Sequence, residues 1–153
     1  MGFFSNNFDD ARKNVVSALK RLGVQETEPD QADDVCATWR LTVGSADVFV
    51  SVIKADGNPD SVVFQVLAPV MELPDKDLLP LYRKLLELNA SALFGACFSL
   101  EGATVNVLGE RLALNLDEDE FVRLIDRVAG YADKYDDELV SEFGGIRASD
   151  QTG

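Results

Sequence analysis

Histidine is missing from this sequence of 153 residues, and only two cysteines are present. Without histidine, no Ser-His-Asp or Cys-His catalytic group can form, and most zinc and copper sites lose their commonest ligand. Cys36 and Cys97 lie far apart in the sequence and show no Cys-x-x-Cys spacing. A zinc or thioredoxin-type site therefore has no ligands to build on, and two ordinary reduced cysteines are favoured over reactive thiols.

The sequence also lacks the glycine and carboxylate patterns that are typical of cofactor sites. Its glycines form neither Gly-x-Gly-x-x-Gly nor the phosphate-binding Gly-x-x-x-x-Gly-Lys-Ser/Thr. The loop at 56–60 does not have the residue order of a calcium loop. In the acidic runs at 117–120 and 136–138, neighbouring carboxylates point around a helix and do not converge. We therefore expect no catalytic residues, no metal and no cofactor.

Basic residues are scarce, with 14 Lys and Arg against 27 Asp and Glu, which gives a formal net charge of −13. A protein that binds the nucleic-acid backbone needs a basic stripe, and none is visible, so nucleic acid is not expected as a partner. The acids gather at 24–34 and at 117–142. Either these segments are a solvated surface that keeps the protein in solution, or they attract a basic segment of a partner. Composition leaves both interpretations open.

Long apolar runs are absent, since none approaches the ~20 residues of a membrane helix. The first residues lack the basic and long apolar segments of a signal peptide, and Asn6 stands where an N-myristoylation signal needs Ser or Thr. From these features we expect a cytoplasmic protein that does not use a membrane as its partner.

What is present is a regular alternation of apolar and polar residues. The alternation in 35–43 and 46–53, separated by Gly-Ser at 44–45, predicts a hairpin with a two-residue turn. A tight turn pairs Trp39 with Val50, and Arg40 with Phe49 on the opposite face. A third strand is predicted over 61–70.

A second set of strands is predicted after a helix. A turn at 101–102 pairs Phe98 with Val105, and a turn at 109–110 pairs Val107 with Leu112. Both turns place apolar residues on one face, and Arg111 then points outward.

Apolar residues at helical spacing predict three helices: 8–22, one that begins near residue 77, and one that follows the acidic residues at 117–120. The order is α-β-β-β-α-β-β-β-α, an α+β fold in which helices pack on one apolar face of an antiparallel sheet. We expect a single domain over 1–143 and a flexible C-terminal tail over 144–153, which has Ile146 as its only large apolar residue.

Apolar residues also fall on the strand face that is turned away from the predicted helices. Candidate partner-binding residues on that face or before the first helix are Phe49, Ile53, Val63, Leu67, Phe3 and Phe4. Together they form a larger patch than scattered surface residues make. Either this patch binds a partner, or helix ends and a second copy of the chain cover it.

The stretch from 85 to 128 resembles the YbjN-like family, also described as bacterial sensory transduction regulators. The motifs that carry the resemblance are Leu-Leu-Glu-Leu-Asn at 85–89, Phe-Gly at 94–95, Glu-Gly at 101–102, Leu-Ala-Leu at 112–114 and Leu-Asp-Glu-Asp-Glu-Phe at 116–121. The resemblance implies the fold of type III secretion chaperones and a small acidic protein that forms a homodimer. It also implies a chaperone-like or regulatory role, in which hydrophobic patches hold an extended partner polypeptide.

Three functions remain open at this stage. A non-enzymatic domain that binds a partner polypeptide fits the patch and the resemblance. A small-ligand-binding domain would need a pocket between sheet and helices, around Trp39, Phe64 and Phe98. A carboxylate-based hydrolase would need two acids that face each other across a cleft, which the sequence does not place.

Overall fold

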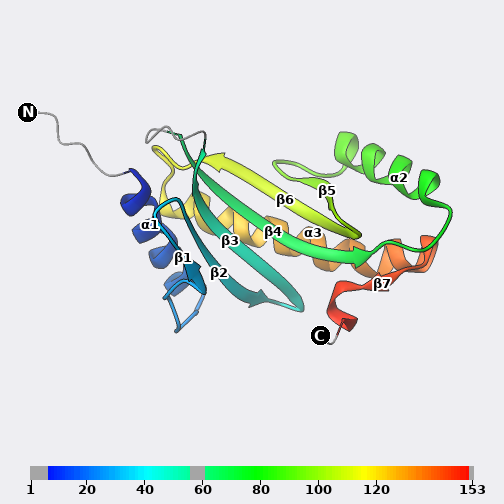
Figure 1. Ribbon diagram of the computed structural model, residues 1–153, viewed down its shortest axis with the longest axis horizontal. Coiled ribbons are helices and arrows are strands. Elements are labelled where there is room, and N and C mark those ends of the chain that lie inside the picture. The colour runs from blue at the N-terminus through cyan, green and yellow to red at the C-terminus, as the bar shows by residue number, and fades with distance from the viewer. Residues whose placement is uncertain (1–6, 56–60, 152–153) are drawn as a thin grey trace, which may run out of the picture.

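The computed structural model describes residues 7–55 and 61–151. These residues form one antiparallel sheet in which the strands lie in the order β1-β2-β3-β4-β6-β5, as Figure 1 shows. The strands are β1 (Gln31–Ala32), β2 (Cys36–Val43), β3 (Ala46–Lys54), β4 (Val62–Glu72), β5 (Cys97–Glu101), β6 (Thr104–Leu112) and β7 (Ile146–Arg147). The short β7 pairs with the end of β4. The predicted α+β class, with an antiparallel sheet and helices, is confirmed.

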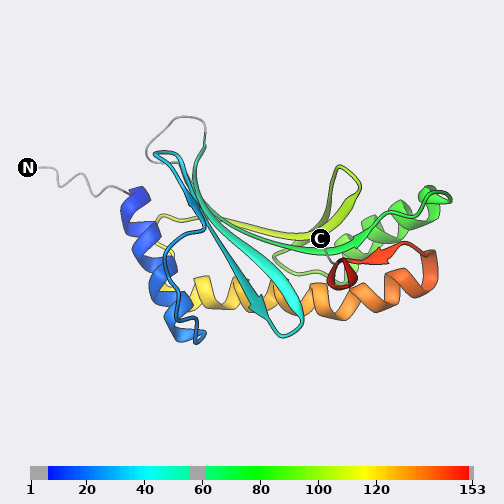
Figure 2. The same ribbon diagram turned by 60° about the horizontal axis from the view of Figure 1, so that its bottom comes forward.

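Two helices cover one face of this sheet, which we call the inner face. Helix α3 (Glu118–Phe143) runs along the sheet, and α1 (Asn7–Arg21) packs beside the first part of α3 (Figures 1 and 2). Helix α2 (Leu78–Ser91) lies at the end of the sheet, next to β5. No described helix has the length and apolarity that crossing a membrane requires.

The apolar stripes expected on the first and third helices are buried. In α1 the buried residues are Phe8, Ala11, Val15, Ala18 and Leu19. In α3 they include Phe121, Leu124, Ile125, Val128, Ala132, Tyr135 and Leu139. Asp117 and Glu120 form a capping box at the start of α3, in which each side chain accepts a hydrogen bond from the other residue's backbone N–H. The acidic first turn thus fixes where this helix begins.

The first hairpin has the predicted register. Val43 pairs with Ala46 across the Gly44-Ser45 turn, Trp39 with Val50, and Arg40 with Phe49. Gly44 takes a φ of 63°, which a two-residue hairpin turn requires and glycine adopts without strain.

The second hairpin differs from the prediction in two ways. Its register is displaced by two residues, so that Phe98 pairs with Val107 and Leu100 with Val105. The turn expected at 109–110 does not exist, because β6 continues without a break from Thr104 to Leu112. The predicted third strand of this set is therefore the end of β6, and the element order has one strand fewer here than expected.

Gly109 explains the error, since it serves close packing and not a turn. A Cβ at this position would lie 2.7 Å from Leu124 Cδ1 and 3.0 Å from Val128 Cγ2 of α3. Glycine thus allows α3 to lie against β6 at a distance that any side chain would prevent. Without a turn, the alternation along β6 continues to its end. Arg111 then points toward α3 instead of outward, and Leu112 points outward instead of into the core.

The C-terminal segment follows the sheet edge. After α3, β7 pairs Arg147 with Met71 and Ile146 with Glu72, and a short 3-10 helix η2 (Ala148–Asp150) follows. Arg147 forms ion pairs with Asp137 and Asp150. The expectation that residues 144–153 form a flexible tail concerns how far this segment moves, and it stays a prediction.

Replacing Gly109 by alanine should destabilise the protein by about 1–3 kcal/mol, because the new Cβ forces α3 away from β6. Gly130 is the matched control: it lies in α3, and no described atom beyond its own helix backbone comes within 4 Å of the point that a Cβ would occupy. Gly130→Ala should stabilise by about 0.5–1 kcal/mol through helix propensity. Urea unfolding measures both variants, and a neutral Gly109→Ala would contradict the role given to this glycine.

Candidate functional site

The sheet face opposite α1 and α3, the outer face, carries two apolar rows that cross the strands. One row contains Phe49, Leu67 and Leu108, which are neighbours on β3, β4 and β6. The other contains Ile53, Val63 and Leu112 on the same three strands. We call them the Phe49 row and the Ile53 row. Each row is continuous because the β3, β4 and β6 registers bring outward-pointing residues side by side.

A polar row lies between the two apolar rows. Its members are Thr38, Ser51, Gln65 and Glu110 on β2, β3, β4 and β6. The Thr38 and Ser51 hydroxyls are 2.9 Å apart and hydrogen-bonded, and Gln65 donates to the Glu110 carboxylate at 2.7 Å. The outer face therefore alternates apolar, polar and apolar over a distance of about 14 Å along the strands.

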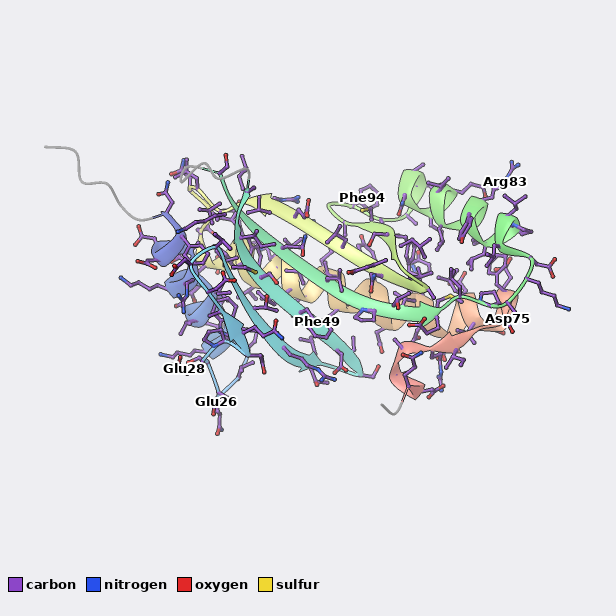
Figure 3. The ribbon with its side chains drawn as sticks, viewed as in Figure 1. Glu26, Glu28, Phe49, Asp75, Arg83 and Phe94 are labelled. Carbon is purple, nitrogen blue, oxygen red and sulfur yellow. The ribbon has the colours of Figure 1, made fainter. Side chains whose placement is uncertain are left out.

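The apolar residues of this face are only partly shielded. Phe49, Ile53, Val63 and Leu67 are half-buried, and Leu112 is 65% exposed. Figure 3 shows Phe49 on the face turned toward the viewer, with α3 behind the sheet. The Arg40 guanidinium lies 5.8 Å from the centre of the Phe49 ring and pairs with Asp47. The structure thus brings four of the predicted partner-binding residues together, while their role in binding stays a prediction.

Phe3 and Phe4, the other two predicted residues, lie outside the described residues. Leu112 was missed because the turn expected at 109–110 placed it inside the core. The signal that could have revealed it is the alternation itself, which runs unbroken from Thr104 to Leu112.

Helix α2 presents a second apolar surface. Leu79 and Leu86 are 81% and 68% exposed, whereas only Leu81 and Leu85 of this helix are buried. Arg83 and Glu87 form an ion pair on the exposed side, and Figure 3 labels Arg83 at the end of the molecule. Residues 75–91 contain three bases and three acids, so this segment is neutral in a chain of charge −13. The sequence predicted a broad apolar helix here but not which side remains uncovered.

The interior around the three aromatic residues is filled by protein side chains. Phe64 packs on Phe121 with ring centres 4.3 Å apart, and Phe98 packs on Tyr135 at 5.4 Å. The buried Trp39 donates a hydrogen bond to the Thr27 carbonyl at 2.9 Å. These ring contacts occupy the space between Phe64, Phe98 and α3, whereas a hollow of about 200 Å³ opens beside Trp39 at the β2 edge of the sheet.

Another hollow, of about 420 Å³, lies between the β2–β3 turn, the end of β4 and the C-terminal segment. Its carboxylates are held by structural partners: Asp47 by Arg40, Glu72 by the Thr104 hydroxyl, and Asp136 by the backbone N–H of Asp137. Burial raises the pKa of Asp136, and the nearby acids Asp137 and Asp133 raise it further. No three His, Cys, Asp or Glu side chains of the described residues converge as metal ligands.

The two cysteines are separate free thiols on the outer face, and both are half-buried. Burial, with a smaller contribution from Glu110, raises the pKa of Cys97. A raised pKa lowers the thiolate fraction at neutral pH, which is opposite to what a nucleophilic cysteine needs.

The fold and this sequence match a known family. Residues 9–151 match the family described as T3SS (YopN, CesT) and YbjN peptide-binding chaperone 1. The chain belongs to this TY-Chap1 family. The resemblance found in the sequence motifs is therefore confirmed, and the match spans nearly all of the described residues. None of the curated protein sequences matches this member of the TY-Chap1 family.

Several solved structures share the fold of this TY-Chap1 member. A chain of the ExsC-ExsE complex aligns with a TM-score of 0.63 and 15% identity, covering 86% of this chain and 95% of that one. A chain of the heterodimeric ExoU-SpcU complex from the type III secretion system of Pseudomonas aeruginosa gives 0.56 and 19%, covering 80% and 94%. A chain of the HopA1-SchA chaperone-effector complex gives 0.57 and 11%, covering 90% and 99%. At these identities, the likeness establishes the fold.

The raised pKa of Asp136 leads to a testable pH dependence. A carboxyl whose folded pKa lies above its unfolded value stabilises the fold below the unfolded pKa, and this contribution is lost as the pH rises through the folded pKa. At neutral pH, Asp136→Asn should therefore stabilise the protein by roughly a few tenths of a kcal/mol, because solvent screens a half-buried carboxylate. Below pH ~4 the gain should disappear. Urea unfolding at neutral pH and below pH ~4 measures the free energy of unfolding of both proteins. Asp126→Asn, at an exposed position of α3, is the control. A gain in stability that persists at low pH would contradict the raised pKa of Asp136.

Proposed function

We propose that this protein binds an extended segment of a partner polypeptide on its outer face and holds it without chemical change. The observation that carries the proposal is the arrangement of a polar row between two apolar rows on a sheet face that no described helix covers. Membership of a family of peptide-binding chaperones supports it.

The spacing of the rows fits an extended chain. Each apolar row lies two residues from the polar row, which is about 7 Å along a strand. Side chains of an extended peptide alternate from one side to the other. A peptide that follows the polar row can therefore place successive apolar side chains on the Phe49 row and the Ile53 row. Its backbone groups then meet Thr38, Gln65 and Glu110, the more accessible members of the polar row, which can exchange hydrogen bonds with them.

The charges around this face favour a partner segment that is basic at one end. Glu26, Glu28 and Asp30 lie together beside β2, next to Arg40. Figure 3 shows Glu26 and Glu28 at the edge of the molecule below α1. Of the two interpretations of the acidic segment at 24–34, we favour attraction of basic side chains, because its acids gather at the β2 edge, which a partner on the outer face can reach.

We further propose that the protein is a non-enzymatic, cytoplasmic bacterial protein that forms a homodimer through α2. Leu79 and Leu86 are exposed within the segment 75–91, whose charges balance. Two copies of charge −13 repel each other at most orientations, and contact through a neutral apolar surface minimises that repulsion. The carboxylates of the hollow, each engaged by a structural partner, support a role without catalysis.

Replacing Phe49 and Leu67 together by glutamine should weaken peptide binding at least about tenfold. Each substitution removes an apolar side chain that the bound peptide would bury, and the free energy of that burial is lost. Peptides enriched from a random-sequence library on the wild-type protein provide the probes, and fluorescence anisotropy gives the affinities. Val35→Gln, an exposed apolar residue outside both rows, should leave the affinities unchanged. Failure to enrich any peptide, or equal loss in both variants, would refute the proposed surface.

The dimer proposal predicts a mass of twice 16.7 kDa for the wild type in light scattering after size exclusion. Leu79→Asp with Leu86→Asp should shift the protein to a monomer, because two carboxylates would be buried without partners. Leu114→Asp, at another exposed leucine, should leave the dimer intact. A monomeric wild type at micromolar concentration would reject α2 as a dimer surface.

A further inference from the structure

Two arginines converge on one glycine at the β6 edge of the sheet. Arg127 Nη1 and Arg111 Nη2 lie 2.6 Å and 2.8 Å from the point that a Cβ on Gly95 would occupy. Gly95 has a φ of 68°, a left-handed backbone conformation that favours glycine. Arg111 comes from β6 and Arg127 from α3, and the loop before β5 brings Gly95 against both. Residues from three elements thus form one basic place in an acidic protein.

This basic place has no carboxylate partner in the described part of the chain. In the described residues, the arginines that form ion pairs with carboxylates are Arg21, Arg40, Arg83 and Arg147, and neither Arg111 nor Arg127 is among them. Arg111 Nη1 donates to the Glu110 carbonyl at 3.0 Å, which holds the guanidinium in position while Nη2 faces Gly95.

Nearby carboxylates are engaged elsewhere. Arg111 and Arg127 line a pocket of about 150 Å³ together with Glu120 and Arg123. The Glu120 carboxylate accepts a hydrogen bond from the Asp117 backbone N–H and forms no ion pair with these arginines in the described structure. The Glu110 carboxylate accepts from Gln65 on the outer face. Two guanidinium groups this close repel each other, and an anion between them converts that repulsion into two charge-assisted hydrogen bonds.

The basic place lies on the α3 side of β6, next to the end of the Ile53 row on the outer face. That row ends at Leu112, the residue after Arg111, and Leu112 is 65% exposed. Phe94, the residue before Gly95, is 70% exposed, and Figure 3 shows it at the side of the molecule away from Glu28. Beyond Leu108, β5 no longer pairs with β6. A peptide that follows the outer face from β2 toward β6 therefore reaches a part of β6 that pairs with no described strand on its far side. If it passes over this edge, it meets the apolar side chains first and then the two arginines on the α3 side.

We propose that Arg111 and Arg127 bind a carboxylate of the partner polypeptide, next to an apolar residue that contacts Leu112 or Phe94. This inference rests on the proposed peptide-binding function and adds an orientation to it. The acids beside β2 attract the basic end of the segment, and the arginine pair binds its acidic end. The partner class is an extended segment with opposite charges at its two ends and alternating apolar residues between them.

The probes that test this proposal are synthetic peptides in which valine alternates with threonine, with lysine at one end and aspartate at the other. Each peptide has a twin in which asparagine replaces the aspartate. Fluorescence anisotropy with a neutral dye should show the aspartate peptide binding about fivefold more tightly to the wild type. The double variant R111Q/R127Q should bind both twins equally, with the affinity of the asparagine twin unchanged. The wild-type preference should shrink as salt is added.

Control variants separate this proposal from a general charge effect. R83Q/K84Q removes the same charge from α2 and should keep the fivefold preference. The single variants R111K and R127K preserve charge and should keep part of the preference. Arg83, Arg111 and Arg127 are exposed and Lys84 is half-buried, and thermal melts check that all variants fold.

The outcomes distinguish the two proposals. Binding of both twins with equal affinity to the wild type overturns the arginine site while leaving the peptide-binding function intact, and so does a preference that survives R111Q/R127Q. A change of oligomeric state in R111Q/R127Q would assign the pair to contact between copies and also overturn it. If neither these peptides nor any library peptide binds the wild type, the proposed function fails and the arginine site fails with it.

Discussion

The close contact between α3 and the inner face of the sheet is the constraint on which the other features depend. Gly109 permits that contact, and Phe64 and Phe98 fill the layer behind it through their ring contacts with α3. Because α1 and α3 together cover the inner face, apolar side chains that point the other way have no helix over them in the described structure. Apolar residues of the outer face thus stay exposed, because α1 and α3 pack on the inner face and α2 packs at the β5 end.

Alternation along the strands predicted most of this architecture, because the side-chain period of two fixes which face each residue occupies. It placed Phe49 and Ile53 outward correctly, since the tight turn at Gly44 left one register for β2 and β3. It failed at Gly109. Glycine allows either a positive φ in a turn or close approach of a neighbouring element, and the local sequence around 109–110 suits both. Only the position of α3, which is remote in sequence, decides between them.

That error accounts for what the sequence could not predict about the β6 end of the outer face. With a turn at 109–110, Leu112 would be in the core and Arg111 would be isolated on the outer face. Without it, Leu112 extends the Ile53 row and Arg111 meets Arg127. The positions of the charges could not be predicted from the sequence either. The counts of acids and bases give the net charge, but only the fold brings Arg111 and Arg127 together near Gly95. Clusters built from three separate elements leave no periodic signal in any one of them.

The joining of the first helix to the last has a consequence for how the chain is made. Ser17 donates a hydrogen bond to Glu118, and Arg21 forms ion pairs with Glu118 and Asp119, so α1 is fastened to the first turn of α3. During translation α1 leaves the ribosome long before α3, the helix that packs beside it. Its contacts with β3 and β4 can form earlier, but the side of α1 that packs on α3 has no partner while the strands up to β6 are synthesised. Folding of the region around α1 therefore cannot finish before α3 is complete, and a nascent chain truncated before Glu118 lacks the contacts that hold α1 in place.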